Sequence, residues 1–138
     1  MSDTYETGFL VVSCSGCSCS GQATNDLAVE LNRSGFARMV CLAGIAAGLD
    51  NCVADAANVQ DLIVIDGCVN ACAKKVLEKA GIKPVHTFCL TEMGLEGQDT
   101  EIDSELLEKL RLKIKQVFGQ SRTATKYAVC GCETCVRE

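Results

Sequence analysis

The stretch Leu-Ile-Val-Ile-Asp-Gly-Cys-Val-Asn-Ala-Cys, residues 62–72, decides the fold of this chain. Its first four residues form an unbroken apolar run rich in β-branched side chains, which is typical of a strand covered on both faces of a parallel sheet. Gly67 then permits a tight turn, and residues 69–80 have the spacing of a helix with one apolar face. A buried strand followed by an amphipathic helix is the unit from which α/β folds are built.

The rest of the chain repeats this alternation. We expect strands at about 8–13, 37–41, 62–66 and 84–90, and helices at about 22–34, 69–80 and 101–118, with one short helix near 53–58. The inward positions of the last two long helices are expected to be Val69, Ala73, Val76, Leu77 and Ala80, then Ile102, Leu106, Leu110, Ile114 and Val117. Short links imply parallel strands with right-handed crossovers. The predicted fold class is α/β: one three-layer domain over residues 1–119, with a four-stranded, mainly parallel sheet in the order 2-1-3-4 and helices on both faces, followed by a Cys-rich tail at residues 120–138.

Composition narrows the class of protein. The 138 residues are 48% hydrophobic, enough for one aliphatic core, and the net charge is −5 with no run of Lys or Arg, so nucleic acid is not an expected partner. No apolar stretch reaches the roughly 18 residues of a membrane span. Eleven cysteines would suggest disulfides in a secreted protein, but their number is odd and the polar, acidic N-terminus lacks the basic start of a signal peptide. We therefore expect a reducing, cytoplasmic location, where clustered thiols bind metal or do redox chemistry.

Cysteines follow the predicted strands. Cys14, Cys41, Cys68 and Cys89 each stand at or just after the end of one apolar run, and Cys72 follows Cys68 by four residues. Because the carboxyl ends of parallel strands lie along the edge where α/β sheets place ligands, we expect these thiols to converge there.

The segment Asp66-Gly67-Cys68 carries the sharpest local signal. On a helix beginning near residue 69, Cys68 would lie at the N-terminus, and Cys68 and Cys72 would share one face. Asp66 and Gly67 are the candidate supporting residues: the carboxylate to orient a ligand or accept loop N–H groups, and the glycine to allow close backbone approach.

At these residues the chain resembles the DGC-domain family of zinc-binding proteins, named for its Asp-Gly-Cys motif. The resemblance covers about residues 8–97, and the matching stretches are residues 14–16, 41–45, 65–68, 71–75 and 91–94. It implies four chelating cysteines, which correspond here to Cys14, Cys41, Cys68 and Cys72, and it implies no specific biochemical activity. Four thiolates suit tetrahedral Zn²⁺, so the physical interpretation supports the set that the resemblance implies.

Further thiols depart from the family pattern. Cys17 and Cys19 lie in the loop after the first strand, and Cys130, Cys132 and Cys135 cluster in the tail. These five are candidates for a second metal cluster, and the tail is also a candidate redox relay or contact for a protein partner.

Cys52 and Cys89 are interpreted as small apolar core residues, and the single histidine, His86, as a packed side chain rather than a ligand.

Three functions remain open at this stage. The first is a cysteine-thiolate Zn²⁺ protein involved in metal or soft-species handling or sensing. The second is a thiol–disulfide oxidoreductase using Cys68 and Cys72, which would make the chain an enzyme, and the third is an iron–sulfur protein, since four thiolates also hold such a cluster.

Overall fold

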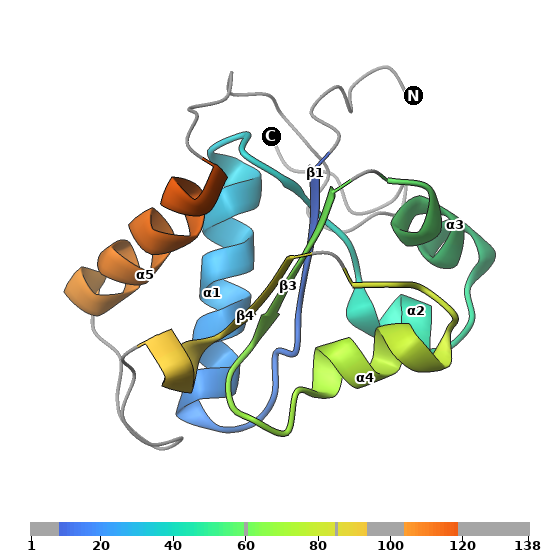
Figure 1. Ribbon diagram of the computed structural model, residues 1–138, viewed down its shortest axis with the longest axis horizontal. Coiled ribbons are helices and arrows are strands. Elements are labelled where there is room, and N and C mark those ends of the chain that lie inside the picture. Colours follow the sequence, from blue (N-terminus) through green and yellow to red (C-terminus); the bar gives the residue numbers. More distant parts are fainter. Residues whose placement is uncertain (1–8, 60, 85, 94–103, 119–138) are drawn as a thin grey trace.

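The computed structural model describes residues 9–59, 61–84, 86–93 and 104–118. Its centre is a sheet of four strands, β1 (Phe9–Ser13), β2 (Arg38–Met39), β3 (Asp61–Asp66) and β4 (His86–Cys89). All pairings are parallel, and the strand order β2-β1-β3-β4 confirms the predicted fold class and topology (Figure 1). A long apolar run such as β3 is buried because helices cover both of its faces.

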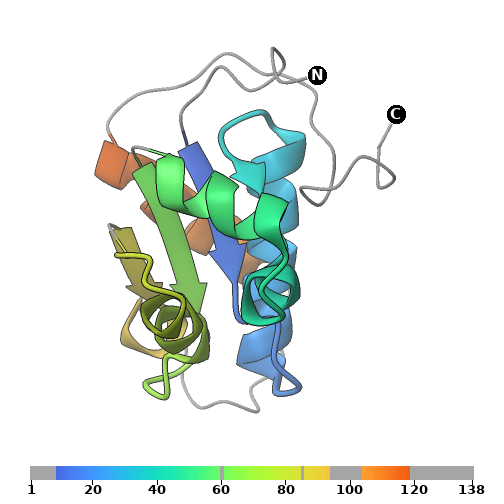
Figure 2. The same ribbon diagram turned by 90° about the vertical axis from the view of Figure 1, so that its right-hand side faces the viewer.

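Helices form the two outer layers. α1 (Cys19–Arg33) and α5 (Ser104–Phe118) lie on one face of the sheet, and α2 (Leu42–Ala46), α3 (Asp50–Asn58) and α4 (Cys72–Lys79) lie on the other (Figures 1 and 2). A short 3-10 helix, η2 (Leu90–Met93), follows β4. No helix within the described residues is long and apolar enough to cross a membrane.

Alternating side chains of the strands divide the core in two. Phe9 and Val11 of β1 belong to a cluster with α1 and α5, whereas Leu10 and Val12 belong to a second cluster under α2, α3 and α4. This division follows from the two-residue period of a strand. It means that residues at the strand ends also point alternately to one helical layer or the other.

The chain changes direction between β1 and β3. From β1 it crosses over through α1 to β2, and from β3 it crosses through α4 to β4 on the opposite side of the sheet. Neighbouring strands whose connections diverge leave a crevice at their carboxyl ends, which is the usual ligand site of open α/β sheets. In Figures 1 and 2 this edge is the lower one.

Several predicted boundaries were wrong. α1 begins at Cys19 rather than residue 22, because Ser18 caps it: its Oγ accepts the N–H of Gly21 at 3.1 Å. The segment expected to hold one short helix contains two, α2 and α3, separated at Gly48, whose φ of +79° favours glycine. The second and fourth strands are shorter than predicted, and β4 begins two residues after Pro84.

The predicted helix at 69–80 is shortened to α4 at Cys72–Lys79. Val69, expected to face inward, lies in the preceding turn and is 71% exposed, while Ala73 and Leu77 are buried as predicted. In α5, Leu110 and Ile114 are buried but Val117 is 61% exposed, so the inward face ends earlier than predicted. The predicted start of that helix, including Ile102, and the tail thiols Cys130, Cys132 and Cys135 lie outside the described residues.

Candidate metal centre

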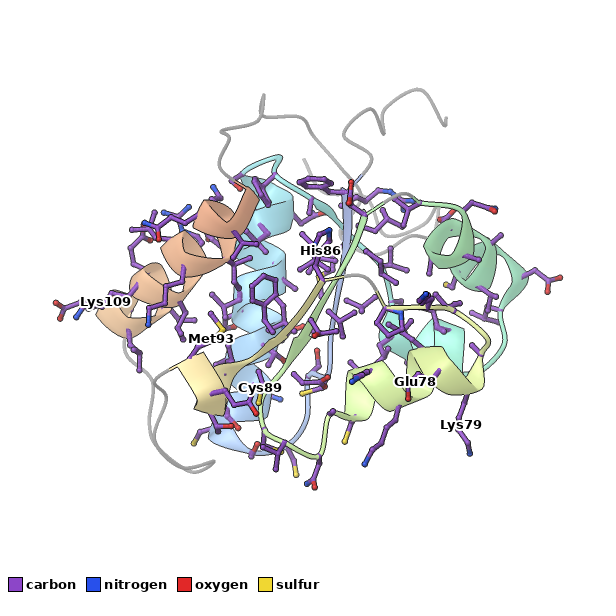
Figure 3. All side chains as sticks on the ribbon, viewed as in Figure 1. Glu78, Lys79, His86, Cys89, Met93 and Lys109 are labelled. Carbon is purple, nitrogen blue, oxygen red and sulfur yellow. The ribbon has the colours of Figure 1, made fainter. Side chains whose placement is uncertain are left out.

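The carboxyl edge of the sheet carries the cysteines that the sequence placed at strand ends. Cys14 directly follows β1, Cys41 lies two residues beyond β2, Cys68 lies two residues beyond β3, and Cys89 ends β4. Figure 3 shows several sulfur atoms along this lower edge, with the labelled Cys89 there and His86 at the opposite end of β4. The predicted convergence on one edge is therefore what the fold produces.

Cys14 and Cys41 are the better enclosed pair. Both are half-buried and pack against the second core cluster, and both line one pocket of about 410 Å³. The Sγ of Cys41 accepts the N–H of Gly44 at 3.4 Å, which makes Cys41 the N-cap of α2. The Sγ of Cys14 lies 3.6 Å from Oγ1 of Thr24. Each sulfur thus has a defined neighbour and position.

Cys68 and Cys72 stand at the two ends of a turn, not on one helix. The N–H of Ala71 donates to the carbonyl of Cys68 at 3.1 Å, and Ala71 itself adopts the left-handed conformation, with φ 52° and ψ 52°. Cys68 is half-buried, whereas Cys72, the first residue of α4, is exposed. The prediction that Cys68 occupies the helix N-terminus is therefore wrong, because the helix starts only after this turn.

Asp66 anchors the same turn through hydrogen bonds to the start of α4. Its side chain is buried, and its two carboxylate oxygens accept the N–H groups of Ala73 at 2.8 Å and Lys74 at 3.2 Å. Burial raises the pKa of this carboxyl above the ordinary 3.8, and the two N–H groups act in the opposite direction. Because Ala71 has no side chain that could cap α4, a residue six positions before the helix does so instead. Asp66 thereby ties the end of β3 to the first turn of α4.

Gly67 brings the turn against α1. A Cβ at this position would lie 2.8 Å from the carbonyl carbon of Ser20 and 2.9 Å from the nitrogen of Gly21, so only glycine fits without displacement. Cys17 lies in the loop that leads into this first turn of α1, and Cys19 is the first residue of the helix rather than part of the loop as predicted; both thiols are exposed. The close approach predicted for Gly67 is thus made to backbone.

Cys89 occupies a place that the sequence interpretation undervalued. It pairs in register with Asp66 across β3 and β4, and its Sγ lies 3.3 Å from Oγ1 of Thr91. It is half-buried at the carboxyl edge. The position of Cys89 at a strand end was the sequence signal for a place on this edge. The sequence interpretation gave more weight to the frequent burial of cysteine as a small apolar residue.

The core interpretation is confirmed for Cys52, which is buried in the second cluster. His86 is partly buried, and its Nε2 lies 3.0 Å from Oδ1 of Asp61 at the amino end of the sheet. It lies at the opposite end of β4 from the thiols, as Figure 3 shows.

The donor types on this edge fit a thiophilic metal ion. The metal site itself is only partly formed. Within the described residues, no three His, Cys, Asp or Glu side chains are grouped closely enough to hold a metal ion. What the structure brings together is a pair of thiols in a pocket and a second pair on an adjacent turn.

Comparison with known proteins places the chain in a family. The model of the DGC domain matches residues 10–114, which extends from β1 into α5. Over 102 residues the chain is 37% identical to the anaerobic and virulence modulator AnvM of Pseudomonas aeruginosa, a match that covers 71% of this chain and 78% of that protein. No solved structure matches the chain. The motif Asp66-Gly67-Cys68, its position after β3 and the extent of the family match lead to one conclusion: the chain belongs to the DGC-domain family.

Proposed function

We propose that this protein binds Zn²⁺ at the carboxyl edge of its sheet through the thiolates of Cys14, Cys41, Cys68 and Cys72. The observation that carries the proposal is that three adjacent strands, β2, β1 and β3, each deliver a cysteine to the same edge. Cys72 adds a fourth thiol across a single turn from Cys68. Four sulfur ligands at about 2.3 Å are the usual closed shell of structural zinc.

Closure of this shell requires the turn to approach the pocket. Cys14 and Cys41 already line one cavity, whereas Cys68 and Cys72 belong to a loop held at its base by Asp66 and Gly67. In our proposal the metal joins the two pairs. Four thiolates around Zn²⁺ carry a net charge of −2, so N–H donors such as that of Gly44 to Cys41 stabilise the bound state.

The two core clusters are large enough to fold this domain without metal, unlike a zinc finger, in which metal binding and folding coincide. Because folding does not depend on the metal, the metal can have a regulatory role in place of a structural one. The relative AnvM is named as a modulator. We propose that in the present protein the metal state of this edge serves sensing or modulation.

Metal analysis of the protein purified without added metal tests this function. We expect zinc in the wild-type protein and the loss of one equivalent in Cys68→Ser. Cys89→Ser is the matched control, because it removes a half-buried thiol at the neighbouring strand end outside the proposed set. Bound iron with visible absorbance would show that the site holds an iron–sulfur cluster and not zinc. A metal-free protein with a rapidly alkylated Cys68 would favour the oxidoreductase. Equal zinc loss in both variants would refute the ligand set.

A further inference from the structure

We propose that the outer surface of α2, α3 and α4 is a docking site for a second copy of this chain, so that the protein forms a two-fold symmetric dimer. The surface centres on a pocket of about 720 Å³ that residues of these three helices line. In Figure 2 this helical layer faces the viewer. The contact uses none of the four thiols assigned to zinc, so the dimer stands or falls independently of the metal.

The pocket is apolar and lies beside an exposed apolar segment. Ile45, Val53 and Val76 contribute its larger apolar side chains, and apart from two charged residues the rest of the lining is Ala or Gly. The adjoining residues 46–49, Ala-Ala-Gly-Leu, are all exposed, and Leu49 is 53% exposed. Consecutive apolar residues that stay exposed beside an apolar pocket are typical of a surface that contacts another molecule.

Leu49 and the pocket are complementary features of the same surface. Gly48 and Asp50, on either side of Leu49 in the chain, both line the pocket, so Leu49 stands at its rim. In a two-fold symmetric contact each copy presents the same surface, and each must therefore supply both the projection and the cavity. A small ligand could fill the pocket but would leave Leu49 exposed, whereas a second copy covers both.

The two charged residues of the pocket form a self-complementary pair. Asp50 begins α3 and Lys79 ends α4, so the acid and the base belong to different walls, and Figure 3 shows Lys79 extending outward from its helix. Both residues are exposed, and neither forms an ion pair within the described part of the chain. In a two-fold arrangement Asp50 of each copy faces Lys79 of the other. The lining has no net charge, which limits the repulsion between two chains that each carry −5.

Leu49 permits a variant that removes the contact without disturbing the fold. It is the N-cap of α3, and its side chain makes no capping hydrogen bond. Asparagine is a favoured N-cap residue, so Leu49→Asn should preserve the start of α3 while it removes the apolar projection. Because the dimer buries two copies of Leu49, we expect its dissociation constant to rise about 100-fold, roughly tenfold for each copy. Leu112→Asn is the matched control, since Leu112 is 45% exposed on α5, across the sheet from this surface.

Charge reversals test whether the partner is a second copy. Asp50→Lys alone and Lys79→Glu alone should each weaken self-association by about tenfold, because like charges then meet twice in every homodimer. An equimolar mixture of the two variants should associate as tightly as the wild-type protein. In that mixed dimer the two introduced charges face each other, and so do the original Lys79 and Asp50. Recovery on mixing is expected only if the surface binds its own counterpart.

Sedimentation equilibrium of the full-length chain over a range of concentrations gives each dissociation constant. Reductant and a metal chelator in the buffer exclude dimers joined by disulfides or by bridging metal, and circular dichroism verifies that each variant is folded. A chain that stays monomeric, a dimer that Leu49→Asn and Leu112→Asn weaken equally, or charge variants that do not recover on mixing would overturn the proposal. A monomer that carries a bound small molecule in native mass spectrometry would also overturn it, because the pocket would then have a different occupant.

Discussion

The loop after β1 and the loop after β3 both bring cysteines to the same edge of the sheet, but they are held in different ways. Each contains one non-glycine residue in the left-handed region, Ser15 in the first loop and Ala71 in the second. In the first loop two residues of α1 hold the strained residue: the N–H of Ser15 donates to Oγ1 of Thr24, and its hydroxyl donates to Oδ1 of Asn25. Ala71 has no polar side chain, so groups of other residues must hold the second loop.

Those residues are Asp66 and Gly67. The carboxylate caps α4 from the end of β3, and the glycine lets the loop rest on the first turn of α1. In the first loop, by contrast, Ser18 caps α1 from the adjacent position. The difference teaches that the Asp-Gly part of the motif is explained by anchoring the turn, while the cysteines that flank the turn are left available for chemistry.

The largest expected effect comes from Gly67→Ala. The added Cβ would meet the backbone of Ser20 and Gly21 at 2.8–2.9 Å, and since backbone cannot rotate away, the variant should lose about 1–3 kcal/mol of unfolding free energy. Gly16→Ala is the matched control in the first loop, where the new Cβ would meet only the Sγ of Cys14 at 3.9 Å. Urea unfolding of both variants measures the difference. Equal losses would show that the second loop is not held by this contact.

Removal of the two caps should have a smaller effect. Asp66→Ala leaves the buried N–H of Ala73 without its acceptor, and we expect a loss of about 1–2 kcal/mol in unfolding free energy. Ser18→Ala removes an adjacent cap from α1 and should cost about 1 kcal/mol.

The two cap variants are distinguished by their local effects. Hydrogen exchange should speed up at Ala73 and Lys74 in the first variant and at Gly21 in the second. Unchanged exchange at Ala73 in Asp66→Ala would show that the carboxylate does not hold the turn.

The smallest effect concerns the thiols themselves. In metal-free protein, Cys72 is exposed and should be alkylated faster than Cys14 and Cys41, which are half-buried beside Thr24 and Gly44. Peptide mass spectrometry over a time course gives each rate in one experiment. Faster alkylation of Cys14 and Cys41 than of Cys72 would contradict this prediction.

Much of this architecture could be predicted from the sequence. The apolar run before Asp66 indicated a central parallel strand, and the alternation of strands and helices indicated the strand order that the structure has. The failures are local. Two short helices replaced one because Gly48 ends the first, and α4 began late because a turn stabilised from outside its own residues preceded it.

The candidate site likewise has a part that the sequence could predict and a part that it could not. Residue types and their positions at strand ends determined which thiols share an edge, because parallel strands joined by helical crossovers must end on the same side. Spacing along the chain could not determine that Cys14 and Cys41 line one pocket, or that Asp66 reaches the amides of Ala73 and Lys74. Those relations join separate elements of the fold, so only tertiary packing decides them: the two core clusters fix where each strand end meets its helix.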